Sequence, residues 1–496
     1  MRGENRQATW GLSSVRAWGC ILLWLAAPAA AKEYYVRPPP AGNDAWPGTL
    51  AKPFATVGRG LNALGAGDTL YIGSGIYYEG DFYPQVNATP SNPITIRNIP
   101  GETPILDGGL TRWQFVELIA LDGYVFQGLV VRNYYDIGIS CRHTGYVTVR
   151  GCILHGNGSA GVALNYASYP HAAYDAHMIV EGNVCYENGW SVGWASGIHL
   201  NNKGQGGSAS AHVIRRNLCY NNLDHSDYHT DGNGIMFDVG GGGACLIENN
   251  LCFNNGGAGI RAMDGRATII NNTCFRNAWD AQNDYQPPEI ELIEQHTPGS
   301  VSGSVVRNNL VWSRAKREFE GSYYGGVFGT DGVSVGDFVF ENNVLWSDQP
   351  SEVVLEPWMT ACVQAVPAFR ATAIDNGFTT LHGATILSMN VANYDFRLKG
   401  NSPGVDVGSG VAAPDADLAG TPRPWSSGYD VGAYEYVSDG DCNGDGQVAF
   451  ADWEHAAGCL AGPNVPRPTE CTCCDMDGDA DIDLLDMAAF QRTFQP

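Results

Sequence analysis

One short phrase recurs along the middle of the chain and restricts the fold more than any other feature. It combines an asparagine, a cysteine two positions later and then an aromatic residue, as in GNVCYEN and NNLCFNN. The copies begin 22 to 37 residues apart, a variation that a stack of coils with loops of unequal length tolerates. We therefore predict a coiled solenoid from eight copies, at residues 128–134, 151–157, 182–188, 216–222, 249–255, 271–277, 308–314 and 342–348.

Two columns of residues appear when the copies are aligned. Stacked coils place equivalent residues about 4.8 Å apart, so asparagines at a turn can hydrogen-bond along the stack. The cysteine column continues as Val311 and Leu345, which favours buried thiols over disulfides between coils. A zinc site is disfavoured because the body has no CxxC or Cys/His set. The columns are Asn183, Asn217, Asn250, Asn272, Asn309 and Asn343, and Cys185, Cys219, Cys252 and Cys274.

The repeat and both ends of the body resemble the right-handed parallel β-helix proteins of the pectate-lyase-like superfold. The resemblance covers residues 33–436, from YYV…GNDAWPGTLAKPFATVGRG to NYDFRLKGNSPGVDVG…DVGAYEY. It implies an all-β solenoid domain over residues 32–437, with a helix that caps the N-terminal end of the stack. The spacing of apolar residues agrees with a helix in this segment, because four of them share one helical face. These residues are Phe54, Val57, Leu61 and Leu64.

A second phrase with strand periodicity follows each coil, at residues 161–165, 197–201, 234–238, 259–263 and 289–293. Period-two alternation directs one apolar set inward: Val162, Leu164, Ile198, Leu200, Ile235, Phe237, Ile260, Ala262, Ile290 and Leu292. The outward positions stack into a column of Ala163, His199, Met236, Arg261 and Glu291, beside a second column of Asn165, Asn201, Asp238 and Met263. Long loops at residues 202–211 and 223–233 flank this face.

A sheet face with such loops suits an extended glycan, and its charged residues form our candidate catalytic set. That set is His199, Lys203, Asp231, Asp238, Arg261 and Glu291, with Asp264 nearby. β-Elimination on a uronate needs a group that neutralises the carboxylate, either Arg261 or Ca²⁺ on the aspartates. It also needs a base, for which His199, Lys203 and Arg261 qualify. Glycoside hydrolysis instead needs two carboxylates, Asp238 with Glu291 or Asp231. We favour the lyase reaction slightly.

Each candidate also has a structural interpretation. Asp238 and Arg261 lie on adjacent coils and can form a surface ion pair. Asp231 and Asp264 precede or follow strands, where aspartate shapes turns. His199 can be an ordinary residue of the sheet face. The alternative to an enzyme is therefore a non-catalytic β-helix that binds glycans or serves as a structural protein of the cell surface.

The C-terminal residues 438–496 hold two matched acidic loops, DCNGDGQVAFAD and DMDGDADIDLLD. Oxygen ligands recur at positions 1, 3, 5 and 12 of each loop, a spacing typical of Ca²⁺ sites. Both loops end in aspartate and lead into a short helix, which resembles a dockerin module and implies a cohesin-like or cell-surface partner. Five cysteines predict one or two disulfides with one thiol left over. The predicted metal ligands are Asp441, Asn443, Asp445, Asp452, Asp475, Asp477, Asp479, Asp483 and Asp486.

The N-terminal residues 1–31 combine arginines, the apolar run CILLWLAA and an alanine-rich end. This pattern predicts a signal peptide and a secreted protein, and the run is too short to span a bilayer. The net charge of −24 disfavours nucleic acid as a partner. We expect a polysaccharide partner and a monomeric body.

Overall fold

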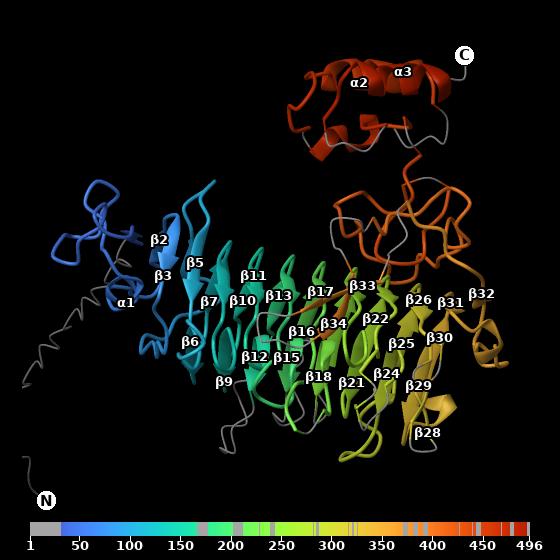
Figure 1. The fold of residues 1–496 in the computed structure, drawn as a ribbon, viewed down its shortest axis with the longest axis horizontal. Helices are drawn as coiled ribbons and strands as arrows, with labels where there is room; N and C mark the ends of the chain where they lie inside the picture. Colours follow the sequence, from blue (N-terminus) through green and yellow to red (C-terminus); the bar gives the residue numbers. More distant parts are fainter. Residues whose placement is uncertain are drawn as a thin grey trace, which may run out of the picture. The chain divides into compact units, whose positions relative to one another are not determined.

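Three long parallel β-sheets run along the body of the protein (Figure 1). The computed structural model describes residues 31–165, 177–201, 212–227, 229–238, 244–280, 282–283, 287–315, 317–319, 322–324, 326–370, 375–379, 385–389, 395–425, 427–438, 440–442, 448–467, 469–476 and 481–493. The chain divides into two compact units, Met1–Ala31 and Lys32–Pro496. The predicted signal peptide therefore lies outside the described residues except for Ala31.

Each coil contributes one strand to each sheet in turn, which gives the parallel β-helix that the repeat predicts. The first sheet contains β1 (Glu33–Val36), β2 (Thr69–Ile72), β4 (Ile94–Asn98), β7 (Tyr124–Gln127), β10 (Thr148–Arg150), β13 (Ile179–Glu181), β16 (His212–Arg215), β19 (Ala244–Glu248), β22 (Arg266–Ile270), β25 (Ser304–Arg307) and β30 (Phe338–Glu341). The second contains β3 (Gly75–Tyr77), β5 (Pro104–Asp107), β8 (Val130–Arg132), β11 (Ile153–His155), β14 (Val184–Tyr186), β17 (Leu218–Tyr220), β20 (Leu251–Phe253), β23 (Thr273–Phe275), β26 (Leu310–Ser313), β31 (Val344–Ser347) and β32 (Val363–Gln364).

The third sheet is the one that the second sequence phrase predicts. Its strands are β6 (Val116–Ile119), β9 (Ile139–Arg142), β12 (Ala160–Asn165), β15 (Ser196–Asn201), β18 (Asn233–Asp238), β21 (Ile260–Met263), β24 (Ile290–Ile293) and β29 (Phe328–Asp331). The described remainder is two hairpins, β27 (Arg317–Phe319) with β28 (Ser322–Tyr324) and β33 (Asp375–Thr379) with β34 (Thr385–Met389), and the helical segments α1 (Val57–Leu61), Val335–Asp337, Pro350–Glu352, α2 (Phe450–Cys459), Thr469–Cys474 and α3 (Leu484–Thr493).

The core lies between the three sheets, and the predicted inward residues fill it. The ten inward side chains of the third sheet are at most 1% exposed and belong to one apolar cluster. The cysteine column is confirmed, because Cys185, Cys219, Cys252 and Cys274 are consecutive partners across β14, β17, β20 and β23. These four thiols are fully buried and form no disulfide. Val311 follows Cys274 in the column, so an apolar residue replaces the thiol directly.

The predicted asparagine column is a hydrogen-bonded ladder. Asn217 Nδ2 donates to Asn250 Oδ1 at 3.0 Å, and Asn250 Nδ2 donates to Asn272 Oδ1 at 3.0 Å. Each Oδ1 also accepts a backbone N–H, as Asn250 Oδ1 does from Asn217 at 3.0 Å. The buried amides of this turn are therefore satisfied within the stack. The whole ladder runs through Asn183, Asn217, Asn250, Asn272, Asn309 and Asn343.

A second ladder lies at the turns that lead into the third sheet, and our sequence analysis missed it. It runs through Asn157, Asn188, Asn222, Asn255 and Asn277. Glu289 ends it by accepting hydrogen bonds from the backbone and side-chain nitrogens of Asn277. The signal was present, because these asparagines occupy the seventh position of the recurrent phrase.

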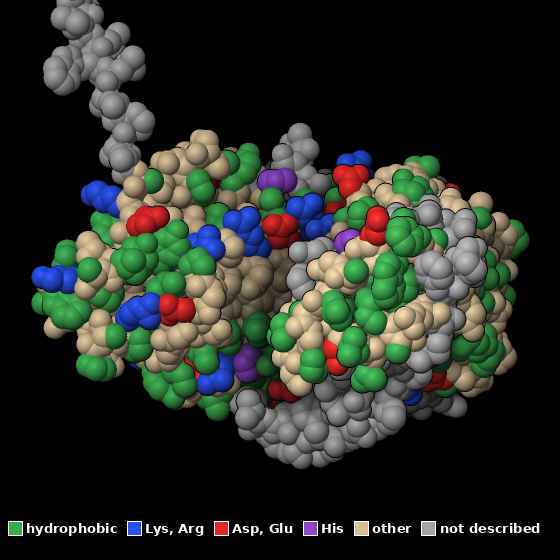
Figure 2. All heavy atoms as spheres, turned by 90° about the horizontal axis from the view of Figure 1, so that it is seen from above, with side chains coloured by type: hydrophobic (Ala, Val, Ile, Leu, Met, Phe, Trp, Pro, Cys, Tyr) green, Lys and Arg blue, Asp and Glu red, His purple; other side chains and the backbone are tan. Residues whose placement is uncertain are grey.

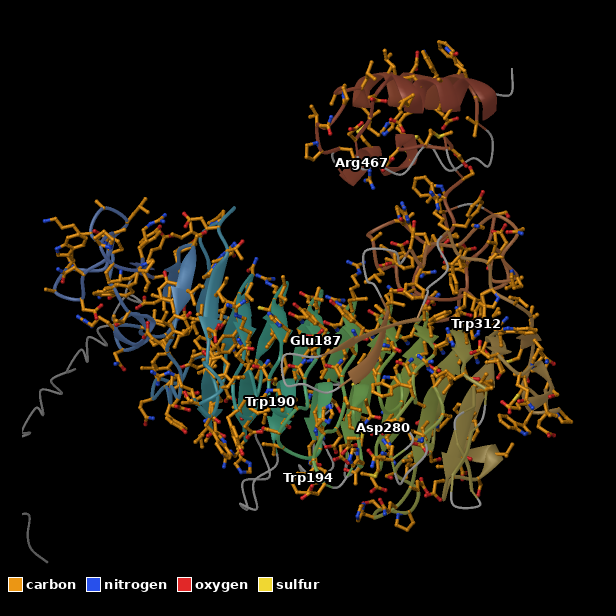
Figure 3. All side chains as sticks on the ribbon, in the orientation of Figure 1. Glu187, Trp190, Trp194, Asp280, Trp312 and Arg467 are labelled. Carbon is orange, nitrogen blue, oxygen red and sulfur yellow. A yellow bond between two sulfur atoms is a disulfide. The ribbon has the colours of Figure 1, made fainter. Side chains whose placement is uncertain are left out.

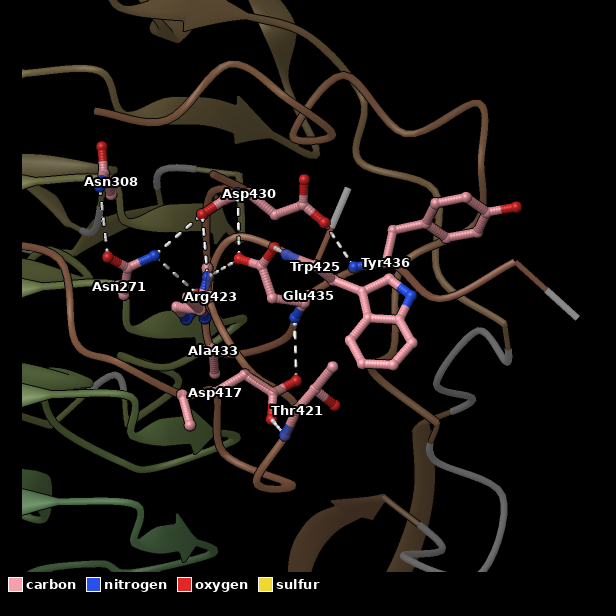
Figure 4. Close-up of polar contacts among 12 residues, drawn as sticks. Asn271, Asn308, Asp417, Thr421, Arg423, Trp425, Asp430, Ala433, Glu435 and Tyr436 are labelled. Atoms are coloured by element: carbon pink, nitrogen blue, oxygen red, sulfur yellow. Dashed lines mark hydrogen bonds and ion pairs between the residues drawn. The ribbon is translucent and has the colours of Figure 1, made fainter. Parts of the chain in front are cut away.

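A C-terminal strap, residues 405–436, lies along the turns between the first and second sheets. Asn249 Nδ2 donates to the carbonyl of Ala416 at 2.7 Å, and Asn308 Nδ2 donates to that of Ser409 at 2.7 Å. Arg423 is buried in the strap, where its guanidinium binds Glu435 and the carbonyl of Gly432 (Figure 4). In the NN pairs at residues 249–250, 271–272, 308–309 and 342–343, the first asparagine binds the strap while the second belongs to the ladder.

Arginines on the first and second sheets pair with acids on neighbouring strands. Arg132 and Asp107 face each other across β8 and β5, with Nε and Oδ2 2.8 Å apart. Arg215 and Glu181 do the same across β16 and β13, at 2.7 Å. Figure 2 shows several basic side chains beside acidic ones on one face of the molecule. These arginines therefore form cross-strand pairs.

The helix α1 forms within the segment that we predict to cap the stack. Thr56 begins it, accepting a hydrogen bond from the backbone N–H of Arg59, and Val57 is buried. That this helix caps the end of the β-helix stays a prediction. In the part of the chain that the structure describes, no helix is both long and apolar enough to cross a membrane.

The two acidic loops of the tail close in the same way. Asp452, at position 12 of the first loop, accepts the N–H groups of Cys442 and Ala449 at 2.7 and 2.9 Å. Asp486, at position 12 of the second loop, accepts the equivalent N–H groups of Met476 and Asp483 at 2.7 and 2.8 Å. The disulfides Cys442–Cys473 and Cys459–Cys471 and the remaining thiol of Cys474 confirm the predicted cysteine usage.

Candidate functional site

The predicted outward column of the third sheet exists in the predicted register. Ala163 is the partner of His199, His199 of Met236, Met236 of Arg261 and Arg261 of Glu291, across β12, β15, β18, β21 and β24. In the neighbouring column Asn201 is the partner of Asp238. The strand periodicity therefore brings these side chains together on one face.

This outward face is not exposed, contrary to what the alternation alone suggests. Each side chain of the column from Ala163 to Glu291 belongs to a residue that is at most 8% exposed. The column from Ala163 to Arg261 lines a groove with a volume of about 590 Å³, together with residues from turns and loops. Four members of the predicted catalytic set line this groove: His199, Asp231, Asp238 and Arg261.

His199 and Asp238, which both line the groove, form an ion pair. The Nε2 of His199 lies 3.3 Å from Oδ2 of Asp238, and its Nδ1 lies 3.1 Å from the carbonyl oxygen of Trp194. Burial lowers the pKa of His199, but the bond to Asp238 and the charges of Asp238 and Asp231 raise it further, so the net shift is upward. A protonated imidazole donates from both nitrogens, which holds the Asp238 carboxylate in place.

Arg261 binds two other acids. Its Nε lies 2.9 Å from Oε2 of Glu291, and its Nη1 lies 3.7 Å from Oδ1 of Asp231. Burial raises the pKa of Glu291 to about 7, against the lowering effect of Arg261. Burial likewise raises the pKa of Asp231. In the described part of the chain, Asp238 thus pairs with His199 rather than with Arg261 as the surface-pair interpretation proposed.

Two other candidates have different places. Asp264 accepts the backbone N–H groups of residues 295–297 and lies 2.8 Å from Nδ1 of His296. Gln295 and His296 line the groove, so Asp264 holds part of the groove wall in place. This agrees with the structural interpretation, in which Asp264 shapes a turn. Lys203 lies outside the described residues.

Three groove residues were absent from the predicted catalytic set. Asp136 lines one wall, where burial, followed by the charge of Glu117, raises its pKa to about 6. Trp194 is 62% exposed and also lines the groove. Asn201 lies in the second outward column, and its Oδ1 is buried without a hydrogen-bond partner among the described residues. The strand alternation placed Asn201 on the outward face, so it could have been included from the sequence. Asp136 and Trp194 lie on turns, to which the alternation does not apply.

The structure describes some of the metal ligands that the sequence predicts in the tail. Asp441, Asp452, Asp475, Asp483 and Asp486 belong to the described residues, whereas Asn443, Asp445, Asp477 and Asp479 lie outside them. Asp481, Asp483 and Asp486 have carboxylate oxygens within 4.8 Å of one another. Carboxylate oxygens are the donors that Ca²⁺ prefers, so the second loop fits that ion. Asp481 was not among our predicted ligands.

Solved structures similar to this chain include two described as lyases and one described as a complex with xylose. A structure titled pectate lyase Pel9A has a TM-score of 0.47 and 16% identity, covering 82% of this chain and 96% of that one. A complex of XylC with xylose has a TM-score of 0.46 and 10% identity, covering 82% and 98%. An alginate lyase from Paenibacillus sp. str. FPU-7 has a TM-score of 0.39 and 17% identity, covering 55% and 91%. At these identities the likeness concerns the fold alone.

No curated protein matches the sequence. Residues 34–291, more than half of the 496, match the family described as Pel9A-like, right handed beta helix region. That segment contains all of β1 except Glu33, the strands β2 through β23 and most of the residues that line the groove. The chain therefore belongs to the Pel9A-like family of right-handed β-helix proteins.

Proposed function

We propose that this protein is an enzyme that degrades a polysaccharide bound in the groove of the third sheet. One observation carries the proposal: two acids, a histidine and an arginine, all buried, converge on one cavity of about 590 Å³. Burying ionisable groups is costly unless they are paired, and such clusters in clefts are characteristic of functional sites. A structural protein has no need for this arrangement on an outward face.

The reaction that these groups support best is glycoside hydrolysis. Hydrolysis needs one carboxylic acid that gives a proton and one carboxylate that acts as base or nucleophile. Burial raises the pKa of Asp231, which suits the acid. Asp238 pairs with a histidine whose pKa is raised, which suits the ionised partner. The two environments thus separate the two roles in the way that paired catalytic carboxylates require.

β-Elimination, which the sequence favoured slightly, remains the second reaction. It needs a cation for the uronate carboxylate, and Arg261 already lies beside Glu291 and Asp231. Lys203 would supply a base, but it lies outside the described residues. His199 is bound on both ring nitrogens, which makes it a poor base. These contacts support hydrolysis over elimination.

The products distinguish the two reactions. We would incubate the secreted form with neutral and uronic polysaccharides and analyse the ends of the fragments. Hydrolysis gives new reducing ends alone, whereas elimination adds an unsaturated, ultraviolet-absorbing end. Asp238→Asn and Asp231→Asn should abolish either product. Asp227→Asn is the matched control, because Asp227 is exposed on the loop that carries Asp231 and does not line the groove. Full activity in D238N would contradict the proposal.

We also propose that the tail binds two Ca²⁺ ions through its matched loops and docks the enzyme on a cohesin-like or cell-surface protein. The shared closure by Asp452 and Asp486 supports the pairing of the loops. Calorimetric titration of the chelator-treated protein should give two sites, and one site in Asp452→Ala or Asp486→Ala. Glu454→Gln, an exposed acid on α2, should keep both. Unchanged stoichiometry in the aspartate variants would refute this assignment.

A further inference from the structure

Two residues that line the groove each have an acceptor oxygen without a hydrogen-bond partner among the described residues. These oxygens are Oδ1 of Asp238 and Oδ1 of Asn201, and each is buried. The two residues are direct partners across β18 and β15, and both line the groove. Asp238 as a whole is 8% exposed, so water reaches its carboxylate poorly.

Such a pair implies a ligand with a defined chemistry. Buried polar atoms in folded proteins almost always have partners, so an orphaned pair on a cavity wall marks a place where a ligand completes the bonding. An ionised carboxylate oxygen and a carboxamide oxygen can only accept hydrogen bonds. The ligand must therefore bring donors, and the neighbouring hydroxyl groups of a sugar ring are donors of this kind.

Trp194 supplies an apolar surface beside these acceptors. Its side chain is 62% exposed and lines the same groove, below the middle coils in Figure 3. Its carbonyl oxygen binds Nδ1 of His199, whose Nε2 binds Asp238. The aromatic residue and the acceptor pair are therefore linked through one imidazole. An exposed indole can pack against the C–H face of a pyranose while the hydroxyls at the ring edge reach polar groups.

The carboxylate at the acceptor pair disfavours an acidic sugar at that position. The groove as a whole has groups of both signs, because His199 and Arg261 line it with Asp136, Asp231 and Asp238, and the guanidinium of Arg261 lies 2.9 Å from Glu291 and 3.7 Å from Asp231. A uronate placed on the acceptor pair would meet carboxylate oxygens, and like charges at short range repel. A neutral ring meets no such penalty.

We infer that Trp194, Asn201 and Asp238 form a subsite for a neutral pyranose ring, whose hydroxyls donate to Asp238 and Asn201 while its apolar face packs on Trp194. The inference rests on the proposed function and narrows it to a polysaccharide with an uncharged sugar at this position. A divalent cation on the two oxygens is the rival occupant, and the experiment separates the two.

The test is calorimetric binding to the full-length chain in the presence of a chelator, with Asp231→Asn to prevent turnover. Neutral xylo-, manno- and galacto-oligosaccharides would be compared with oligogalacturonate and oligomannuronate of equal length. We expect at least one neutral series to bind and the uronates to bind less tightly. Asn201→Ala and Trp194→Ala should each weaken binding by about tenfold, the loss that one well-formed buried contact produces. Asn201→Asp should weaken it further for uronates.

Trp113→Ala is the matched control, because Trp113 is 49% exposed at the turn before β6 but does not line the groove. Its affinity should equal that of the parent, and thermal melts would verify that each variant is folded. Tighter binding of uronates, binding that requires Ca²⁺, unchanged affinity in both N201A and W194A, or no binding of any neutral series would overturn the subsite. Binding without products from the parent enzyme would refute the proposed function and leave the subsite standing.

Discussion

The asparagine ladders and the groove of the third sheet both bury polar side chains. They differ in how the hydrogen-bonding groups of these side chains are paired. In the ladder, Asn250 accepts from two nitrogens of Asn217 and donates to Asn272 and to the carbonyl of Ile214. In the groove, Asp238 and Asn201 each keep an oxygen without a partner among the described residues. Buried polar atoms with partners inside the protein stabilise the stack, whereas those without partners indicate where a ligand can bind.

The sharpest test of this comparison is Asp238→Asn. The substitution removes the charge that pairs with His199 but keeps the size of the side chain. We expect kcat on the active polysaccharide to fall by about 10²–10⁴-fold, the range for loss of an acid–base group. The thermal midpoint should also fall, because His199 loses the carboxylate charge with which it pairs in a buried position, but the loss of activity should be the larger effect. A large loss of stability with retained activity would reverse the roles that we assign.

Asn250→Ala should have the opposite signature. It removes four hydrogen bonds and leaves the buried backbone N–H of Asn217 without its acceptor, whereas Asn272 Oδ1 keeps its bond from the backbone N–H of residue 250. We expect the free energy of unfolding to fall by about 3 kcal/mol, with normal activity in the folded fraction. Asn342→Ala is the control at a ladder turn, since Asn342 Nδ2 makes one exposed bond to the carbonyl of Val407 at 3.3 Å. Equal losses in both variants, measured by chemical denaturation, would contradict the satisfied-ladder interpretation.

Glu291→Gln tests the ionisation of the groove. The pKa of Glu291 is raised from 4.5 to about 7 by burial, so the folded protein binds a proton that the unfolded chain releases. This contribution to stability is complete below pH 4.5 and is lost as the pH rises through about 7. We expect E291Q to remove a pH-dependent decline of about 1–3 kcal/mol in this interval. Parallel unfolding profiles for both proteins would show that Glu291 does not titrate in that range.

Cys252→Val should have the smallest effect. The thiol is fully buried in a column where Val311 already occupies an equivalent position. We expect a change in the free energy of unfolding below about 1 kcal/mol, because valine is a similar apolar side chain. A loss of several kcal/mol, or release of metal from the wild-type body under chelation, would show that the cysteine column does more than fill the core.

The sequence predicted the stack and its register because both depend on local spacing. Asn183 and Cys185 repeat at fixed positions of the phrase, and the alternation around His199 determines which side chains share a face. The second ladder was equally visible at Asn188 and its equivalents, but we did not recognise it. Residues that follow from spacing within a strand or turn were therefore accessible from sequence.

The groove itself was not accessible in this way. Its depth depends on walls formed by turns such as the one that carries Trp194, and periodicity does not describe turns. The choice of ion pairs also depended on side-chain reach: His199 extends to Asp238 on the next strand, diagonal to its own register partner Met236. Spacing predicted the neighbours of each residue, but the three-dimensional packing selected the partners.

The C-terminal strap has a consequence for the order in which the protein is assembled. Its contacts join residues far apart in sequence, as between Asn249 and Ala416, 167 positions apart, and between Asn308 and Ser409, 101 positions apart. The coils are synthesised before the strap. Until the strap emerges from the ribosome, the side chains of these turn asparagines can hydrogen-bond only to water. The strap can dock only on turns that have been synthesised before it, and Arg423 then contacts both Glu435 and Asn249. Chains that end before residue 405 would form the coils but lack the strap. Limited proteolysis of such chains during synthesis would detect the unprotected turns.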